Sequence, residues 1–450
     1  KIAATSTAPQ LFCGYSNATN LTQFGFGTAG DAMSMFNYVL GVGQTNLVTT
    51  MVQRDFSAWS HYVWAIDTTQ VTAANRAKLY VNGVQITSFS TATYPTLNET
   101  MFVNQNTVAQ YIGAQDSGSN YENCYLADFY LIDGQALTPS SFGETNPTTG
   151  AWDPIAYTGT YGTNGFYLPF SDNSAATSTT IGADSSGNGN NWTPSGISVT
   201  AGVTNDSLVD TPTNYGVDTG AGGEVRGNYA TLNPLAAVGN TLSEGNLKTT
   251  GSTTTARVSP GTIYVTSGKW RAEYIATAGS TSVIGVHSAG STFSGGLGST
   301  GAVCDYYSSN GNRYLNGSGA AYGATWTTEQ MAIELDLDTT PSAPTVTFFK
   351  SGVSQGSVTL AAAASAGWTF HMNAGGGTDV GVFNFGQRPW ANTASSGFKA
   401  LCTQNLPDPA IKKASQYFDV NTRTGTGASF SVTGKGFQPD LVWSKGRSGA

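Results

Sequence analysis

The sequence predicts an all-β protein built from serial antiparallel β-sandwiches. Apolar and polar residues alternate over short stretches, and no apolar stripe of helical period and length accompanies them. The 450 residues include 56 glycines and 11% aromatic residues, a composition that suits short strands joined by tight turns. A chain of this length exceeds what one core usually organises, so two or three domains are expected.

The first domain is expected over residues 1–150. Strand-like alternation runs through residues 59–67, 77–81 and 84–86. The dipeptide Asn82-Gly83 separates the last two of these runs and is a strong short-range hairpin signal. The pattern therefore indicates an antiparallel meander in this half of the chain.

Three further segments follow. Residues 151–219 are rich in Pro, Thr, Gly, Asn and Ser, but their aromatic residues need to be buried, so they are expected to form a connector packed on its neighbours. Strand patterning returns over 220–406 and predicts a second sandwich. After Pro407 and Pro409, residues 407–450 are interpreted as the start of a third, incomplete β domain.

Composition and charge exclude two classes of partner. The net charge is −8, only 10% of residues are charged, and no basic run occurs, so binding to nucleic acid through its phosphates is not expected. No apolar stretch approaches the length that spans a bilayer, so membrane insertion is not expected either.

The four cysteines leave two interpretations open. Cys13, Cys124, Cys304 and Cys402 are widely spaced and form no CxxC pair, which argues against a zinc site. A Cys13–Cys124 disulfide would join the two ends of the first domain. Buried free thiols, in a protein assembled in reducing cytoplasm, are the favoured alternative.

The first domain resembles a laminin-G/concanavalin-A-like jelly roll. The resemblance rests on residues 59–63, 78–84 and 111–113, followed by the β-rich run 125–132, in this order and spacing. It covers about residues 1–150. It implies a two-layer sandwich with binding loops at its rim.

The second domain resembles a SPRY-type sandwich over residues 220–406. The motifs that carry the resemblance are Gly268-Lys-Trp270, Leu335-Asp-Leu-Asp338 with the following Val346–Lys350, and Val382–Pro389. Ser351 departs from the pattern, because it stands where Asn would normally make the hairpin turn.

Both domains together are similar to large structural proteins of marine tailed bacteriophages, as are the Asp184–Asn190 loop and the Gly434–Trp443 segment. The resemblance implies a tail-fibre-like protein on the virion surface, assembled in the host cytoplasm. Its implied partners are other virion proteins and a bacterial surface glycan or receptor. A homo-oligomer, by analogy a trimer, is expected because such fibres act through avidity.

One row of carboxylates raises an enzymatic alternative. Glu334, Asp336 and Asp338 alternate along a predicted strand and would share one face. Glycoside hydrolases work through paired carboxylates, so Glu334 and Asp336 define a hydrolase or depolymerase hypothesis. The favoured interpretation is structural, with Leu335 and Leu337 in the core and the acids keeping the strand soluble.

Other catalytic patterns fail in their context. Gly352–Gly356 fits GxSxG, but a hairpin surrounds it where a nucleophile elbow needs a strand followed by a helix. Gly25–Gly30 fits GxGxxG without the βαβ unit that the motif requires. The histidines His61, His287 and His371 are far apart in sequence and are interpreted as sandwich residues. No catalytic centre is therefore expected.

Two loops are the candidate binding sites. The first offers amides, carboxylates and an aromatic ring for a glycan, on Asp116, Asn120, Tyr121 and Asn123. Its oxygens at Asp116, Asn120 and Glu122 also suit Ca²⁺, although no cofactor is required and a plain polar hairpin is the favoured alternative to a metal site.

The second loop lies in the SPRY-like part and mixes aromatic rings, an amide and an arginine, a blend found in adaptable recognition loops. Its glycan-binding candidates are Tyr306, Tyr307, Asn310, Arg313 and Tyr314. The leading hypothesis is thus a non-enzymatic adhesion module. A purely structural spacer or capsid-decoration protein is the alternative.

Overall fold

The computed structural model describes residues 1–3, 10–26, 32–116, 118, 121–212, 225, 227–251, 258–291, 302–374 and 379–446. Within these residues the protein is all-β, and its only helical elements are short 3-10 turns. The predicted fold class is confirmed. No helix in the described part of the chain has the length and apolar character needed to cross a bilayer.

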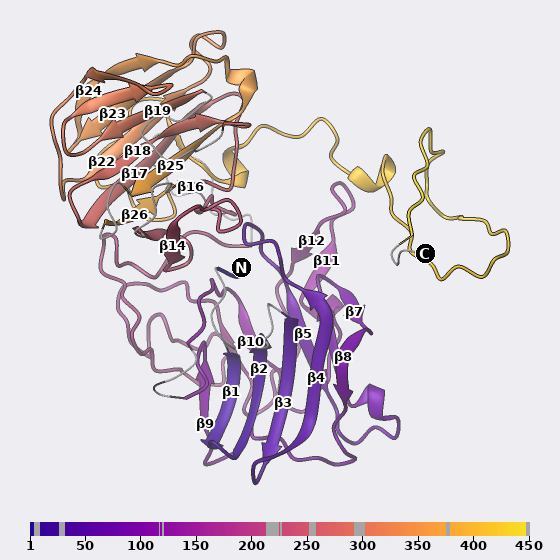
Figure 1. Ribbon diagram of the computed structural model, residues 1–450. Helices are drawn as coiled ribbons and strands as arrows, with labels where there is room; N and C mark the ends of the chain where they lie inside the picture. The colour runs from indigo at the N-terminus through magenta and orange to yellow at the C-terminus, as the bar shows by residue number, and fades with distance from the viewer. Residues whose placement is uncertain are drawn as a thin grey trace.

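A six-stranded antiparallel sheet forms one layer of the first unit (Figure 1). Its strands, in spatial order, are β8 (Phe89–Thr93), β4 (Val42–Val52), β3 (Ala32–Val39), β2 (Asn20–Phe26), β1 (Gln10–Asn17) and β9 (Ala109–Ile112). Phe12, Phe24, Met35 and Leu47 stand opposite one another on four neighbouring strands. All four are buried and form an apolar row that faces the second layer.

The second layer of this unit is assembled from smaller sheets. Its strands are β5 (Tyr62–Ile66), β6 (Ala77–Val81) and β7 (Val84–Ile86) in one sheet, β10 (Phe129–Leu131) with β13 (Phe166–Leu168), and β11 (Gly143–Thr145) with β12 (Trp152–Pro154). The β6–β7 turn holds Asn82 at φ 48° and Gly83 at φ 80°, the left-handed pair that a type I′ hairpin requires. Because β12 and β13 belong to the segment expected as a connector, strand pairing carries the first unit past residue 150.

Two sheets packed face to face form the second unit. One contains β14 (Asn240–Ser243), β15 (Lys248–Gly251), β26 (Val380–Asn384), β17 (Lys269–Ala278), β22 (Met331–Asp336), β23 (Thr345–Lys350) and β24 (Val353–Thr359), with β27 (Lys399–Ala400) beside β17. The other contains β16 (Ser259–Pro260), β25 (Trp368–Ala374), β18 (Ser282–Ser288), β19 (Val303–Tyr307), β20 (Asn312–Leu315) and β21 (Ser318–Ala321). Trp270, Trp326, Trp368 and the predicted core residues Leu335 and Leu337 fill the space between them. A sandwich in this region is what the strand patterning predicts.

The remaining secondary-structure elements are short 3-10 turns. The turns are η1 (Ala73–Asn75), η2 (Pro139–Ser141), η3 (Ala364–Ala366), η4 (Thr403–Asn405) and η5 (Ala414–Gln416).

All four cysteines are free. In the sheets, the backbone of Cys124 pairs with that of Ile2, and the backbone of Cys13 pairs with those of Gln23 and Tyr111. Because both thiols are free, the alternative of a Cys13–Cys124 disulfide does not hold.

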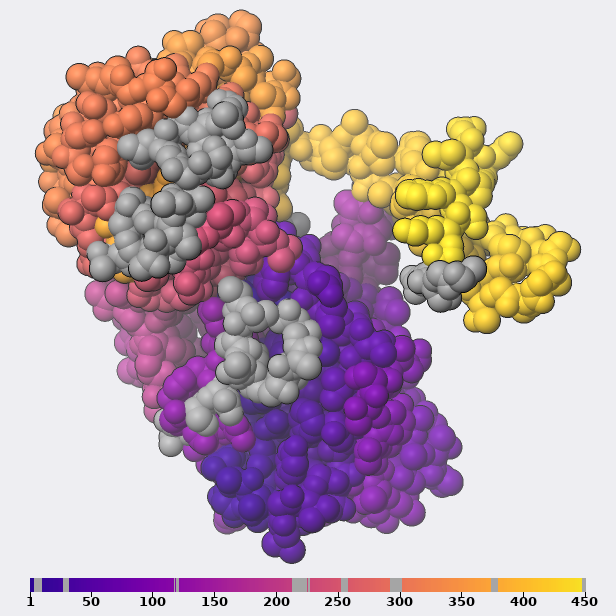
Figure 2. Space-filling view, in the orientation of Figure 1, coloured from indigo at the N-terminus to yellow at the C-terminus, as the bar shows by residue number. Residues whose placement is uncertain are grey.

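The C-terminal segment extends away from the second unit (Figures 1 and 2) and touches the first unit at Lys413, whose Nζ donates to the Pro147 carbonyl over 3.4 Å. Among the described residues, 407–446 contain η5 but no strand, and the interpretation of this segment as the start of an incomplete β domain stays a prediction. Large apolar side chains lie exposed along the segment, with Trp443 86% and Phe418 70% exposed.

Candidate ligand-binding site

A cavity of about 550 Å³ lies between the two layers of the first unit. Phe12, Phe24 and Phe26 of the large sheet line one side, and Tyr62 and Trp64 of β5 line the other. Strand alternation explains this placement, because Phe24 and Phe26 on β2 are two residues apart, as are Tyr62 and Trp64 on β5, so each pair shares one face of its strand. The cavity is therefore walled by flat apolar surfaces.

Stacked aromatic rings extend the wall beyond the sheets. The β10–β13 register places Tyr130 opposite Tyr167, and their rings stack with centroids 4.3 Å apart. Phe142 packs against Tyr130 at 5.4 Å and against Tyr157 at 5.1 Å, and Tyr157 meets Tyr161 edge to face. All five rings line the cavity. Their neighbours hold them in place, so a ligand would meet a preformed surface.

The indole N–H of Trp64 is buried without a hydrogen-bond partner among the described residues. Nearly all buried polar groups in folded proteins are paired, directly or through water, so such an orphan needs an explanation. Trp64 lines the cavity, but its Nε1 has almost no accessible surface, so its N–H would reach a polar ligand atom there only after a small shift of the wall.

Two other polar groups of the wall have shifted pKa values. Trp152 Nε1 donates to His61 Nδ1 over 3.0 Å, and burial lowers the pKa of His61 to about 4. His61 is thus neutral at pH 7 with its proton on Nε2. Tyr167 donates to Asp128 over 2.7 Å, and burial raises the pKa of this carboxyl above its usual range.

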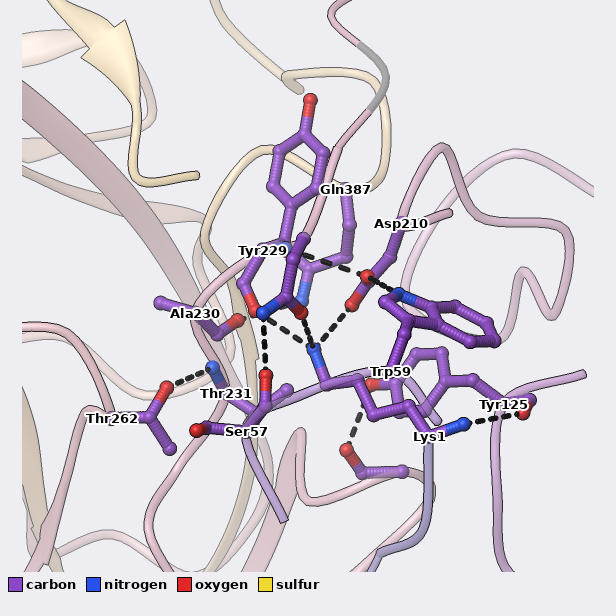
Figure 3. A network of polar contacts seen from close by, with 12 residues as sticks. Lys1, Ser57, Trp59, Tyr125, Asp210, Tyr229, Ala230, Thr231, Thr262 and Gln387 are labelled. Atoms are coloured by element: carbon purple, nitrogen blue, oxygen red, sulfur yellow. Dashed lines mark hydrogen bonds and ion pairs between the residues drawn. The ribbon is translucent and has the colours of Figure 1, made fainter. Parts of the chain in front are cut away.

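Lys1 lines the cavity, and Figure 3 shows its polar contacts. Its fully buried Nζ lies 2.7 Å from Asp210 Oδ2, 2.9 Å from Asn228 Oδ1 and 2.8 Å from the Tyr229 carbonyl. Trp59 Nε1 donates to the other oxygen of Asp210 over 2.9 Å. These contacts join the first unit to the segment that enters the second. The part of the cavity wall formed by Lys1 and Trp59 is therefore also the junction between the units.

The site can bind a ligand with apolar faces and scattered hydroxyl groups. Aromatic rings stack on the C–H faces of such a molecule, while Trp64, His61 and Asp128 bring polar groups to the same wall. Pockets that combine an apolar wall with a few fixed polar groups are the usual form of small-ligand sites. Among the described residues, no group of three His, Cys, Asp or Glu side chains could hold a metal ion.

The first predicted loop lies beside this junction rather than in the cavity. Asp116 Oδ1 accepts the Gly118 N–H over 2.8 Å, and Tyr121 is 61% exposed. Asn123 Oδ1 accepts the Gly245 N–H of the second unit over 3.1 Å. Burial raises the pKa of Glu122 to about 7. Asn120 lies outside the described residues, so the proposed calcium set cannot be assembled from the structure.

The second predicted loop needs one correction. Tyr306 is fully buried in the sandwich core, because it shares the inward face of β19 with Cys304. Its ring cannot meet a glycan. Its sequence neighbour Tyr307 points to the other face and contacts Tyr314 edge to face at 6.3 Å.

The exposed part of that loop is held by Asn310. Its Nδ2 donates to Tyr314 Oη over 3.2 Å, and its Oδ1 accepts the Asn312 N–H. Arg313 is partly exposed and stands opposite Tyr306 on β19. The four remaining candidates therefore lie on one hairpin, well separated in sequence from the aromatic cavity.

Glu334 is an internal ion-pair partner. It stands opposite Arg271 on β17, and Arg271 Nη1 lies 2.8 Å from Glu334 Oε1. Arg271 also pairs with Glu273 at 2.7 Å, and the Ser395 N–H donates to Glu334. Glu334 is 2% exposed, so the expectation that the acids of this strand keep it soluble is wrong for Glu334. The loop that covers this face of the sheet is the reason.

Asp336 and Asp338 do not extend Glu334 into a row. Asp336 ends β22 and pairs with Lys269 at 2.9 Å. Asp338 lies in the following turn, where its Oδ1 accepts the Gly268 N–H over 2.6 Å. The alternation that would align the three acids stops where the strand stops.

The structure also joins residues that sequence spacing kept apart. His371 Nε2 lies 2.7 Å from Asp305 Oδ1, His287 Nδ1 lies 3.3 Å from His371 Nδ1, and Tyr264 Oη lies 2.8 Å from His287 Nε2. These contacts form a continuous chain from Tyr264 to the Asp305 carboxyl. Its two histidines are almost completely buried, at 2% and 0% exposure.

One signal in the sequence could have pointed to this chain. Gly285 interrupts the strand Val283–Val286, and a glycine inside a strand marks a close approach of neighbouring groups. It lies directly between His371 and Asp305 in the sheet register.

Three solved structures are similar to parts of this chain. The crystal structure of the SPRY domain of human HERC1 is similar at 16% identity, over 34% of this chain and 96% of that chain, with a TM-score of 0.28. A crystal structure of a human SPRY domain has 12% identity, 33% and 95% coverage, and a TM-score of 0.28. The TRIM65 PSpry domain has 12% identity, 35% and 89% coverage, and a TM-score of 0.29.

The C-terminal segment matches a protein family. A family described as a domain of unknown function, DUF7483, matches residues 413–450. No curated protein matches the chain.

Proposed function

We propose that this chain is a non-enzymatic adhesion protein that binds a glycan in the aromatic cavity of its first unit. The observation that carries the proposal is the combination of stacked tyrosine rings with the orphan Trp64 N–H in one cavity of about 550 Å³. Sugars offer what this site would take, since a pyranose has an apolar C–H face and a rim of hydroxyls.

The biological setting is proposed from the sequence resemblance. A tail-fibre-like position on a bacteriophage virion would make the ligand a bacterial surface glycan, and avidity in a homo-oligomer would compensate for weak single sites. The absence of catalysis is part of the same proposal. It is supported by the engagement of Glu334 with Arg271 and of Asp336 with Lys269.

A structural spacer is the second candidate, and one observation favours it. The buried Lys1–Asp210 pair ties the first unit to the second, as a load-carrying rod would need. A spacer would bind no ligand.

The test is an array of bacterial polysaccharide fragments, probed with the chain in the presence and absence of Ca²⁺. The wild-type chain is expected to bind at least one neutral fragment without Ca²⁺. Tyr157→Ala, in the cavity wall, should weaken that binding about tenfold, because one stacking ring is worth about 0.5–1.5 kcal/mol. Tyr121→Ala is the matched control, since Tyr121 is exposed on the neighbouring loop and should leave binding unchanged.

Each other outcome assigns a different function. Loss of binding in Tyr121→Ala alone would move the site to the loop of residues 115–123. No binding by the wild-type chain under either condition would favour the spacer. New reducing ends in any bound polysaccharide would overturn the non-enzymatic assignment.

A further inference from the structure

A second, smaller pocket opens on the first unit beside the aromatic cavity. Its volume is about 250 Å³, and it shares the walls Phe12 and Leu131 with that cavity. Amide side chains and two aromatic rings dominate its lining, namely Asn104, Asn164, Asn190, Asn191, Phe166 and Trp192. None of the described lining residues carries a charge.

Asp133 fixes one side of this pocket from behind. Its Oδ1 accepts the Asn104 side-chain amide over 2.8 Å, and its Oδ2 accepts the Asn164 backbone N–H over 3.1 Å. Asp133 lies in the turn that follows β10 (Phe129–Leu131), so this turn positions two groups of the rim. The side-chain amide of Asn164 makes no bond to the protein among the described residues and lies exposed.

Asp184 fixes the other side. Its carboxylate accepts the backbone N–H groups of Tyr167 (2.9 Å), Ser186 (2.8 Å) and Asn190 (2.8 Å). A loop whose turning carboxylate is satisfied in this way is rigid before any ligand arrives. The oxygens of the Asp184 carboxylate thus stabilise the conformation of the Asp184–Asn190 segment through hydrogen bonds, and a metal ion is not needed for this.

The hydrogen bonds also decide which atom of each amide remains available. Asn190 Nδ2 donates to the carbonyls of Thr163 (3.1 Å) and Gly165 (2.9 Å), so its Oδ1 is left as an acceptor. Asn191 Oδ1 accepts the Asp184 N–H over 2.8 Å, so its Nδ2 is left as a donor. By the same reasoning, Asn104 keeps its Oδ1 as an acceptor.

We propose that this pocket is a second sugar subsite that takes one neutral pyranose residue. Two acceptors and one donor at fixed positions match the hydroxyls of a sugar, each of which can donate and accept. The indole of Trp192, packed on Phe166 with centroids 4.9 Å apart, provides a floor for the C–H face. A uronic acid is disfavoured, because Asp133 lies one hydrogen bond behind the rim and no cation lines the described pocket.

The inference rests on the proposed glycan-binding function and extends it to a ligand that occupies two adjoining positions. The test is saturation-transfer NMR, followed by titration, with the methyl pyranosides of glucose, galactose and mannose and with methyl glucuronide. At least one neutral pyranoside is expected to bind, and the glucuronide is expected to bind at least about tenfold more weakly.

Asn191→Asp is the decisive variant. It keeps the oxygen that accepts the Asp184 N–H but removes the donor, and it should weaken pyranoside binding about tenfold. Asn164→Ala, which removes only an exposed amide, should weaken it about threefold. Asn17→Asp is the matched control, because Asn17 Oδ1 also accepts a backbone N–H, that of Thr19, in a remote turn of the same unit.

The outcomes separate this inference from the function on which it rests. Equal pyranoside binding by the wild-type, Asn191→Asp and Asn164→Ala chains would overturn the subsite, as would preference for the glucuronide. If polysaccharide binding is then still sensitive to Tyr157→Ala, the proposed function stands without the subsite. If the wild-type chain binds neither polysaccharide nor pyranoside, both fail.

Discussion

His371 on β25 and Asp305 on β19 hydrogen-bond across the intervening strand β18, with 2.7 Å between Nε2 and Oδ1. They reach each other because the residue between them is Gly285. A Cβ at this position would lie 2.2 Å from the Cys304 carbonyl oxygen and 2.9 Å from both Asp305 Oδ1 and His371 Cε1. The glycine is therefore required by a contact between its neighbours rather than by its own backbone conformation.

Replacing this glycine should be costly. Gly285→Ala is expected to lower the free energy of unfolding by about 2–3 kcal/mol, because the added methyl overpacks a buried site. Urea denaturation measures the change. Gly43→Ala is the control, since Gly43 is exposed on β4 and its nearest neighbour would lie 3.7 Å away. Similar, small effects of both substitutions would contradict the account of Gly285.

The junction between the two units should depend on the buried pair of Lys1 and Asp210. Asp210→Ala leaves the Lys1 ammonium buried without its counter-ion, which typically costs about 3–5 kcal/mol. Calorimetry should then resolve two unfolding transitions where the wild-type chain has one. Asp408→Asn, which removes the exposed partner of Lys412, should leave the thermogram unchanged. A single, unshifted transition in Asp210→Ala would show that other contacts couple the units.

The hairpin between β23 and β24 offers a stabilising substitution. Ser351 adopts φ 48° and Gly352 adopts φ 79°, the left-handed region that Asn tolerates better than Ser. Ser351→Asn is expected to raise the free energy of unfolding by about 0.5–1 kcal/mol. Ser357→Asn, at an exposed position on β24 of the same hairpin, should not stabilise the chain. The prediction fails if the two substitutions act alike.

Stability should depend on pH through His61. Its folded pKa is about 4 and its unfolded pKa is about 6.5, so the unfolded state binds more protons between these values. The contribution of His61 to stability is therefore complete above pH 6.5 and is lost as the pH falls toward 4. Relative to His61→Gln, the wild-type chain should lose about 1 kcal/mol per pH unit in this window.

The wild-type chain must be compared with His61→Gln because Glu122 changes the free energy of unfolding with pH in the opposite direction. Burial raises its pKa to about 7, so its contribution declines as the pH rises from about 4.5 to 7. The two effects partly cancel in the wild-type curve, but Glu122 contributes equally to the wild-type chain and to His61→Gln. Parallel stability curves for these two proteins would contradict the assignment of a neutral, buried His61.

Local patterns predicted much of the fold. Asn82-Gly83 marked a hairpin because its signal lies in two adjacent residues, and Leu335 and Leu337 were placed in the core because alternation on a strand decides which face is buried. The same rule applied to β19 would have placed Tyr306 inward beside Cys304. That error came from treating β19 as part of a loop.

The candidate site could not be predicted in this way. Trp64, Tyr130 and Tyr157 meet only because three separate small sheets assemble opposite β1–β4, and sequence patterns do not specify which sheets face each other. His287 and His371 are 84 residues apart and meet through strand pairing. Glu334 looked accessible because nothing in its strand reveals that residues 390–395 cover it.

The most direct test of the central claim uses the orphan donor in the cavity. Trp64→Phe keeps an aromatic ring and removes only the indole N–H, and it should weaken binding of the glycan fragment selected on the array by about 3- to 10-fold, measured by isothermal titration. Because this N–H has no partner to lose among the residues that the structure describes, its removal should leave the free energy of unfolding of the unliganded chain unchanged or raised. Equal affinity of the wild-type and Trp64→Phe chains for that fragment would contradict the claim that the cavity is the glycan site.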